Sequence, residues 1–164
     1  MMEELTLRLV NALPVRYQST AKQFIKFVAV GAIGAVVDFG SYNLLTRGLG
    51  WTEIYEIFNY QIIAANLVSV LLAITSNFLL NRYWTFRATS GNATGQGAGY
   101  FILNGITFVF NQILTSFFTF HVPIVAIMFG SQKDNAAKAL AIGIILFVNF
   151  LGSKFLVFRN SAKG

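Results

Sequence analysis

The stretch FIKFVAVGAIGAVVDFGSYNLLT, residues Phe24 to Thr46, decides the fold class. Its only charged residues are Lys26 and Asp38, and it is at least as long as the ~20 residues that a helix needs to cross the hydrocarbon core of a bilayer. A transmembrane strand uses about ten alternating residues, and no such alternation is present here. The stretch therefore predicts a membrane-spanning helix.

Three further apolar blocks follow, from Tyr60 to Tyr83, from Gly99 to His121 and from Ala136 to Phe158. The composition agrees, because 55% of the 164 residues are apolar and 11% are charged, whereas about 25% of the residues of a soluble domain are charged. We therefore expect an all-α integral membrane protein with four transmembrane helices. They form one domain, residues 24–160, which follows a cytoplasmic or interfacial segment, residues 1–23.

The segments that flank the blocks are short and polar. In the first of them, leucines at four-residue spacing with arginines between them predict a short surface helix that Pro14 ends. A cleaved signal peptide is the alternative, but the first apolar block is long and lacks a small-residue cleavage site. Between the second and third blocks, residues 84–98 contain most of the SGNATGQGAG stretch, which begins at Ser90. This composition predicts a flexible hinge at the middle of the chain.

Basic residues gather on one side of the predicted spans. With a cytoplasmic amino terminus, nine of the twelve lie inside, namely Arg8, Arg16, Lys22, Lys26, Arg82, Arg87, Lys154, Arg159 and Lys163. The other three, Arg47, Lys133 and Lys138, lie outside. By the positive-inside rule this asymmetry predicts that both ends of the chain are cytoplasmic.

The composition also excludes several function classes. The chain has no cysteine and one histidine, so we expect no metal site, no cofactor and no enzymatic activity. The net charge is +6, and the basic residues lie beside the apolar blocks. This placement favours membrane lipid headgroups over nucleic acid as counterions. No Walker motif that would indicate an ATP-driven pump is present.

The ends of the second and fourth blocks resemble each other. Residues 77–87 read NFLLNRYWTFR and residues 149–159 read NFLGSKFLVFR, so that Arg82 is aligned with Lys154. Chance similarity of two basic helix ends is the alternative to a repeat. Since each half is an out-and-back pair of helices, we predict two parallel helical-hairpin repeats, with a ligand path between them.

Each predicted span has a stripe of small or polar residues at helical spacing. Glycine and serine allow helices to pack closely, and we interpret four positions in this way: Gly31, Gly34, Ser69 and Gly143. The asparagines are more numerous than packing requires. We expect them to line a hydrated polar groove that contains Asn66, Asn77, Asn81, Asn104, Asn111 and Asn149.

Asp38 is the only acidic residue within a predicted span. A carboxylate at such a depth costs about 2.5–3.5 kcal/mol on insertion scales, which predicts a functional role in the groove. The alternative is a structural pair with an amide such as Asn111. Arg82 and Lys154, at the ends of the second and fourth spans, suit a phosphate group, because arginine binds it bidentately and lysine supplies a point charge. Snorkelling to the interface is their alternative role.

With these residues the chain resembles the GtrA-like family of four-span membrane proteins that act on polyprenyl-phosphate-linked sugars. The stretches FIKFVAVGAIGAVVDF, NFLLNRYWTFR and NFLGSKFLVFR carry the resemblance. It implies translocation of such a lipid, for example undecaprenyl-phosphate glucose, across the bacterial cytoplasmic membrane for the synthesis or modification of cell-surface polysaccharide. It also implies that the lipid-phosphate headgroup binds to Asn77, Asn81, Arg82, Asn149 and Lys154.

Two other functions stay open. The chain could be the membrane anchor or partner subunit of a polyprenyl-phosphate glycosyltransferase, since related four-helix units are attached to such enzymes. A small multidrug exporter also has an acidic residue in its first helix, although the excess of basic residues argues against a cationic substrate. Because four helices give little wall for a large headgroup, a homo-oligomer is a further expectation.

Overall fold

The computed structural model describes residues 10–11, 13–57 and 60–159. In this part of the chain, four helices are long and apolar enough to cross a membrane: Val15–Gly48, Ala64–Thr85, Ala93–His121 and Ala136–Val157. The predicted class, a helical membrane protein with four apolar spans, is confirmed. The chain divides into two compact units, Met1–Thr89 (unit 1) and Ser90–Gly164 (unit 2), and each holds one pair of long helices.

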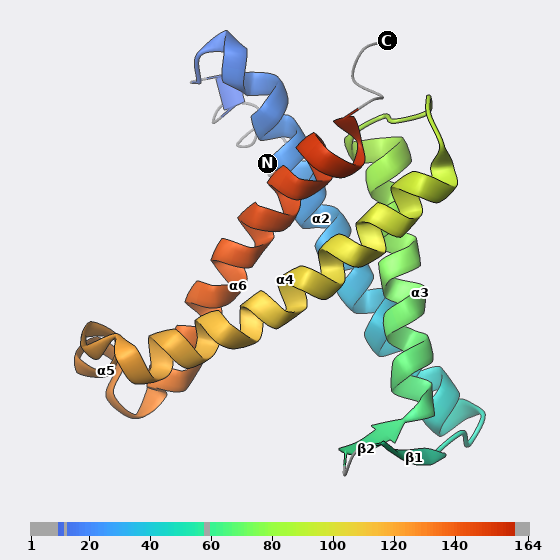
Figure 1. Ribbon diagram of the computed structural model, residues 1–164, viewed down its shortest axis with the longest axis vertical. Coiled ribbons are helices and arrows are strands. Elements are labelled where there is room, and N and C mark those ends of the chain that lie inside the picture. The colour runs from blue at the N-terminus through green and yellow to red at the C-terminus, as the bar shows by residue number, and fades with distance from the viewer. Residues whose placement is uncertain (1–9, 12, 58–59, 160–164) are drawn as a thin grey trace. The chain divides into compact units, whose positions relative to one another are not determined.

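Unit 1 is built on two helices that lie side by side (Figure 1). The helix α2 (Val15–Asn43) continues into the π-helical turn η1 (Leu44–Gly48), and α3 (Ala64–Leu80) continues into the π-helical turn η2 (Asn81–Thr85). Small residues four apart on α3 allow the two backbones to approach closely. The buried residues of α2 and α3 are Phe27, Val30, Gly34, Ala64, Ala65, Ser69, Ala73 and Phe78.

A small β-hairpin, which the sequence analysis did not foresee, connects these two helices. The strand β1 (Ile54–Ile57) pairs antiparallel with β2 (Tyr60–Ile63). The prediction that the second span begins at Tyr60 is therefore wrong, because its helix begins at Ala64. Isoleucine and tyrosine favour strands as well as apolar spans, so hydropathy alone joined these residues to the helix that follows them.

The first span is longer than a bilayer requires. Its continuous helix, Val15–Gly48, has 34 residues, which corresponds to about 50 Å, against about 30 Å of hydrocarbon. It begins directly after Pro14, whose carbonyl accepts a hydrogen bond from the amide of Tyr17 at 2.8 Å. Its first turns therefore lie upstream of the predicted start at Phe24. The greater part of the predicted surface helix, residues 1–9, lies outside the described residues.

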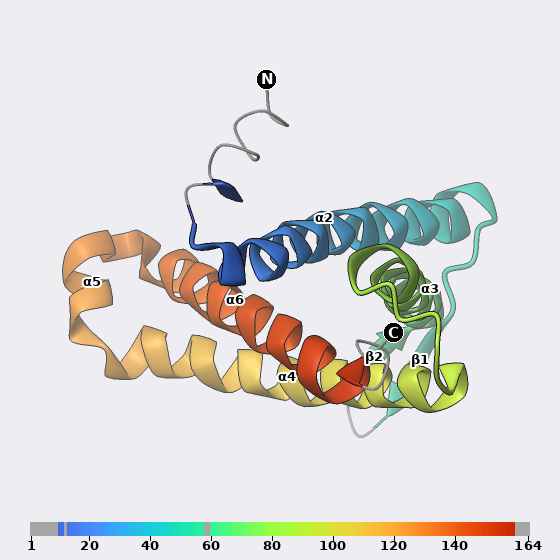
Figure 2. The same cartoon turned by 90° about the horizontal axis from the view of Figure 1, so that it is seen from above.

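Unit 2 is a second pair of long helices with a different connection. The helices α4 (Ala93–His121) and α6 (Lys133–Gly152) lie side by side, and their far ends are joined by the short helix α5 (Pro123–Phe129) and the 3-10 turn η3 (Gly130–Gln132), as Figure 2 shows. The helix α6 continues into a third π-helical turn, η4 (Ser153–Val157). Each unit is thus a helical hairpin whose second long helix ends in a π-helical turn.

Small residues on α6 bring it close to α4. A Cβ atom on Gly152 would lie 2.7 Å from Cδ1 of Leu103, so a larger residue would force the side chain or the helix to move. Ala137 and Ala141, on the same helix, are fully buried. This close packing is typical of helices in a membrane. There the hydrophobic effect does not drive helices together, and small side chains allow extensive van der Waals contacts between them.

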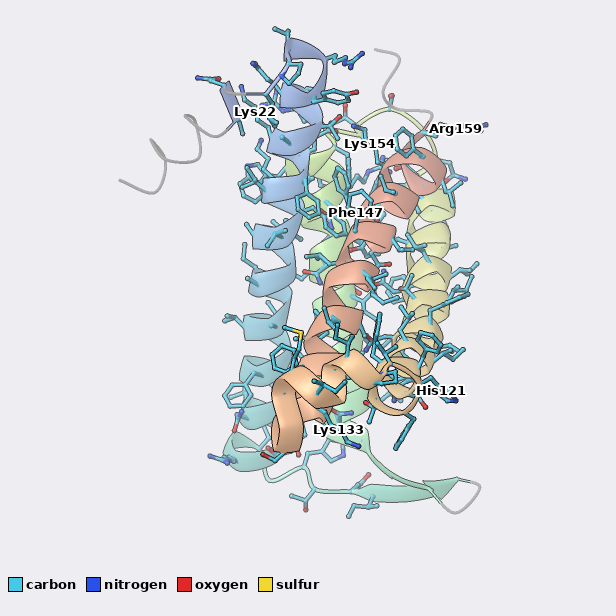
Figure 3. All side chains as sticks on the ribbon, turned by 90° about the vertical axis from the view of Figure 1, so that its left-hand side faces the viewer. Lys22, His121, Lys133, Phe147, Lys154 and Arg159 are labelled. Atoms are coloured by element: carbon cyan, nitrogen blue, oxygen red, sulfur yellow. The ribbon has the colours of Figure 1, made fainter. Side chains whose placement is uncertain are left out.

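The charged and apolar side chains of unit 2 fit a membrane-spanning pair of helices. Figure 3 shows Lys154 and Arg159 at one end of this unit, and His121 and Lys133 at the other. Between the two ends, large apolar side chains such as Phe108, which is 66% exposed, point outward. Lipid would cover this apolar surface, while the charged ends reach the two interfaces.

The stretch predicted as a flexible hinge, residues 84–98, is helical at both of its ends. The turn η2 extends to Thr85, and α4 begins at Ala93. The side chain of Asn92 caps α4, because its oxygen accepts a hydrogen bond from the amide of Thr94 at 3.0 Å. Asparagine in this position satisfies an amide that the helix leaves unpaired. The remaining loop, residues 86–92, contains the division between the two units.

Candidate functional site

Asp38, the acidic residue of the first span, forms a hydrogen bond inside unit 1. The hydroxyl group of Ser69 on α3 donates to Oδ1 of Asp38 at 2.5 Å, and Ser69 is fully buried. A short bond from a hydroxyl to a carboxylate offsets part of the cost of a charge among apolar side chains. Ser69, which the sequence analysis assigned to helix packing, is therefore a polar partner of the acid.

Asn77, which follows Ser69 along α3, lies against Gly34 of α2. A Cβ atom added to Gly34 would overlap the side-chain amide of Asn77. The two helices can approach here only because position 34 has no side chain. The Oδ1 atom of Asn77 is buried and accepts no hydrogen bond from the described residues. Unit 1 thus contains a buried acceptor beside a helix contact that glycine makes possible.

The turn η2 gathers buried polar side chains at the end of α3. Asn81, Arg82 and Thr85 are 1%, 4% and 4% exposed, and the guanidinium carbon of Arg82 lies 5.6 Å from the centre of the Tyr83 ring. A π-helical turn is rare, and such turns occur frequently at functional sites because they redirect side chains. In this turn a cation and two neutral polar groups are held inside the protein.

Two contacts fix η2 against the beginning of α2. The ammonium group of Lys26 donates to the carbonyl of Trp84 at 3.4 Å and lies 5.3 Å from the centre of the Trp84 ring. The rings of Phe27 and Phe86 are 6.2 Å apart. Lysine over an aromatic ring beside a helix end is typical of the membrane interface. Lys26 therefore has a positioning role that the sequence analysis did not assign to it.

Unit 2 has its own polar contact between the two long helices. The hydroxyl group of Thr107 on α4 donates to Oδ1 of Asn149 on α6 at 2.8 Å, and Thr107 is 2% exposed. This hydrogen bond satisfies the acceptor of Asn149, one of the predicted headgroup ligands. Its amide nitrogen is left as the group that could donate to a ligand.

The turn η4 carries Lys154 at the end of α6. Its ammonium nitrogen lies 5.9 Å from the centre of the Phe150 ring and 5.6 Å from that of Phe155. Ser153, the first residue of the turn, is fully buried. The rings of Tyr100 and Phe158 are 6.3 Å apart and join the turn to α4. Lys154 is thus held between aromatic rings and is less buried than Arg82.

The remaining predicted groove residues differ in their environments. Asn66 on α3 is exposed, and the amide nitrogen of Asn104 donates to the carbonyl of Tyr100 on its own helix at 2.8 Å. Asn111 is half-buried, and its Oδ1 atom is a second acceptor without a hydrogen-bond donor among the described residues. Unit 1 contains Asp38, Asn66, Asn77, Asn81 and Arg82, whereas unit 2 contains Asn104, Asn111, Asn149 and Lys154.

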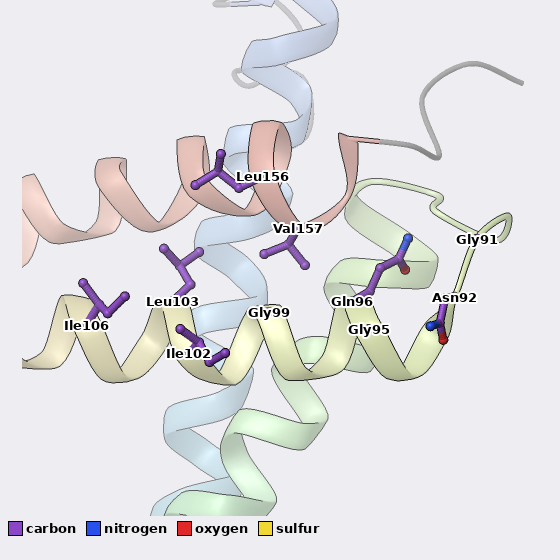
Figure 4. A pocket seen from close by; sticks show the side chains of 10 residues that line it. All are labelled: Gly91, Asn92, Gly95, Gln96, Gly99, Ile102, Leu103, Ile106, Leu156 and Val157. Atoms are coloured by element: carbon purple, nitrogen blue, oxygen red, sulfur yellow. The ribbon is translucent and has the colours of Figure 1, made fainter.

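A cavity of about 400 Å³ in unit 2 was missed by the sequence analysis (Figure 4). It lies between the beginning of α4 and the turn η4. Glycines in the SGNATGQGAG stretch were interpreted as flexible, but their four-residue spacing, which places them along one side of a helix, was the available signal. The cavity is lined by Gly91, Asn92, Gly95, Gln96, Gly99, Ile102, Leu103, Ile106, Leu156 and Val157.

These features define an integral membrane domain made of helical hairpins, each with a buried polar contact and a basic residue on a π-helical turn. Residues 26–158 match the family model described as GtrA/DPMS, transmembrane domain, and the chain belongs to this family. Membership indicates involvement in the processing of polyprenyl-linked sugars by a multi-pass membrane protein of a kind that is generally not catalytic itself. No solved structure matches the chain.

Proposed function

We propose that the protein translocates a polyprenyl-phosphate-linked sugar from the cytoplasmic to the outer leaflet of the bacterial cytoplasmic membrane, with both chain ends in the cytoplasm. The observation that carries the proposal is the burial of Arg82, which is 4% exposed on a π-helical turn at the end of a candidate membrane span. Charged groups within spans are costly and mark paths for ions or substrates. An arginine in such a position can bind a phosphate group through two parallel hydrogen bonds.

In this proposal Arg82 and Lys154 bind the phosphate, as a bidentate fork and as a point charge. The amides of Asn77, Asn81 and Asn149 bind the adjoining part of the headgroup. A polar route lowers the cost of moving sugar hydroxyl groups through hydrocarbon, while the prenyl chain stays in lipid. The side chains assigned to this route are Asp38, Asn66, Asn104 and Asn111.

Similarities between the two units support a shared task. The turns η2 and η4 begin at positions that are aligned in the two related sequence stretches. The ring pairs Phe27–Phe86 and Tyr100–Phe158 each join the first long helix of a unit to the residue after its π-helical turn, at 6.2 and 6.3 Å. We therefore propose that the units are copies of one hairpin, as the sequence repeat predicts.

The proposed repeat also relates the polar contacts of the two units. When Phe27 is aligned with Tyr100, and Asn77 with Asn149, Gly34 corresponds to Thr107. Of the two resulting pairs, Thr107 and Asn149 form a hydrogen bond in the described residues. Conversely, Asp38 and Ser69, which are hydrogen-bonded, correspond to Asn111 and Ala141. The acceptors left over are Oδ1 of Asn77 and Oδ1 of Asn111, which suit the hydroxyl groups of a sugar.

Exchange of a labelled lipid between leaflets tests the proposal. The full chain is reconstituted into liposomes with a fluorescent polyprenyl-phosphate sugar, and loss of the label to an external quencher is followed over time. We expect wild-type protein to accelerate exchange, and Arg82→Gln to slow it about 10- to 100-fold, as loss of a charged hydrogen bond would. Arg87→Gln, at an exposed position of the same helix end, is the control and should keep activity. Exchange no faster than in empty liposomes would overturn the proposal.

A second function is favoured by the family description, which names a transmembrane domain. In this alternative the chain is the membrane anchor or partner of a polyprenyl-phosphate glycosyltransferase. This function would depend on side chains that face lipid or the partner enzyme, and not on the buried side chain of Arg82. Co-purification with such an enzyme that survives Arg82→Gln, together with no leaflet exchange by wild-type protein, would favour this function over translocation.

A further inference from the structure

The cavity of unit 2 is amphipathic along its length. Asn92 and Gln96 lie at one end, and aliphatic side chains line the other, as Figure 4 shows. From Gln96 to Ile106 the helix α4 rises about 15 Å. The lining contains no charged residue. The shape and chemistry therefore fit an elongated molecule with a polar group at one end and an aliphatic chain along the rest of its length.

The aliphatic end opens toward the surface that lipid would cover. Ile102, Ile106 and Leu156 are 63%, 51% and 75% exposed, whereas Gln96 at the polar end is 8% exposed. The volume of about 400 Å³ lies within the roughly 300–1,000 Å³ of sites that hold small organic molecules. A chain could therefore enter sideways from the bilayer without crossing a polar barrier.

Glycines create the free space beside α4. A Cβ atom on Gly99 would lie 3.8 Å from Cγ2 of Val157, which is an ordinary contact distance, so the backbone tolerates a side chain there. The space beside α4 is therefore open because glycines stand at these positions. The backbones of α4 and η4 are not too far apart for side chains to fill it. The turn η4 supplies Leu156 and Val157 to this cavity and Lys154 to the proposed phosphate site.

We propose that this cavity holds the first isoprene units of the polyprenyl chain, with the amides of Asn92 and Gln96 beside the ester oxygen that joins the chain to the phosphate. The inference rests on the proposed function and adds to it a binding site for the polyprenyl chain. None of the residues proposed to bind the headgroup lines this cavity. Branched aliphatic walls fit a chain that carries a methyl group on each unit. Because the phosphate and the beginning of the chain then share η4, one turn fixes the lipid at the point where its polar and apolar parts meet.

Photo-crosslinking tests this site. The full chain in nanodiscs is mixed with a polyprenyl phosphate that carries a diazirine on its first isoprene unit, irradiated, and mapped by peptide mass spectrometry. We expect crosslinks within residues 99–106 and 156–157. Gly99→Leu fills the cavity and should lower the yield about tenfold or more. Gly105→Leu, on the same helix with no atom within 4 Å of an added Cβ, should keep it.

Crosslinks at other segments, a yield that Gly99→Leu does not change, or equal competition by a diacyl phospholipid would each overturn the inference. If Gly99→Leu lowers the amount of folded protein, Ile102→Trp at an exposed lining position replaces it. The leaflet-exchange assay separates this inference from the proposed function. Crosslinks in the cavity without exchange would refute translocation and leave the site, whereas exchange that Gly99→Leu leaves unchanged, without crosslinks, would refute the site alone.

Discussion

At the scale of single residues, a hydrogen bond between two polar side chains joins the paired long helices in each unit. The hydroxyl group of Ser69 donates to Asp38 in unit 1, and that of Thr107 donates to Asn149 in unit 2. Both donors are short side chains that are less than 3% exposed. In hydrocarbon such bonds hold a helix pair in one register, because separating the partners would leave polar atoms unpaired.

Asp38 allows charge and hydrogen bonding to be tested separately. Asp38→Asn keeps an acceptor for the Ser69 hydroxyl group but removes the negative charge. We expect the variant to fold and to exchange lipid more slowly than wild-type protein in the liposome assay, because the polar route loses its only acidic group. A well-expressed variant with wild-type exchange would remove Asp38 from the mechanism, and thermal unfolding in detergent serves as the control for folding.

The absence of a side chain at Gly34 allows α2 and α3 to lie close together. Gly34→Ala should destabilise unit 1 by about 1–3 kcal/mol, because the methyl group of the new alanine overlaps the Asn77 amide. The measurement is the unfolding free energy from denaturant titration in detergent micelles. Gly31→Ala is the matched control, since an added Cβ there meets no atom within 4 Å, and it should be neutral or stabilising. Adding Asn77→Ala to Gly34→Ala should restore much of the loss, and no recovery would contradict the assigned clash.

At the scale of elements, three of the four candidate spans of the described residues end in a π-helical turn. In η1 and η2 the first carbonyl accepts a bond from the amide five residues on, and the next carbonyl accepts one from the amide six residues on. The chain then leaves the helix through a residue with positive φ, Gly50 after η1 and Arg87 after η2. Glycine adopts this conformation freely, whereas an arginine there costs about 1 kcal/mol or more.

Arg87 is therefore a strained position with a clear test. Arg87→Gly should raise the unfolding free energy by about 0.5–1 kcal/mol, because the strain is larger than the chain entropy that glycine loses on folding. Arg159→Gly removes the aligned arginine, whose φ is not positive, and should give no gain. Equal effects of the two variants in the same detergent titration would show that charge, and not backbone conformation, decides the outcome.

The sequence predicted what depends on composition and missed what depends on local geometry. The four spans were predictable because apolar length is a property of many residues together. The β-hairpin was missed because Ile62 and Ile63 suit a strand and a span equally well. The partner of Asp38 was missed because a buried serine reads as a packing residue until a neighbouring helix places it. The helical start of α4 was missed because glycine spacing was weighed as flexibility.

At the scale of the whole molecule, the four candidate spans of the described residues agree with membership of a family of transmembrane domains. The family match ends at Phe158, the residue after η4, and so includes the π-helical turns of both units. Each unit keeps its polar contacts within one pair of long helices. In the translocation proposal, both hairpins contribute side chains to the binding of one lipid.

The orientation in the membrane can be measured because the chain contains no cysteine. Ser90→Cys and Ser131→Cys are conservative changes at exposed positions in the two kinds of connecting segment. By the positive-inside rule, we expect a membrane-impermeant maleimide to label Ser131→Cys in intact cells, and Ser90→Cys only after lysis. The reverse labelling pattern would refute the proposed orientation.

The closing segments at the far ends of the hairpins have a practical consequence. Unit 1 closes with β1 and β2, whereas unit 2 closes with α5 and η3, although both hairpins end their second long helix in a π-helical turn. Because the two hairpins close with such different segments, we expect the closing segment to tolerate replacement. Gly130, with φ of 51° and open space around it, is accordingly a suitable point for inserting a rigid fiducial domain, which would make this small protein large enough for electron cryomicroscopy.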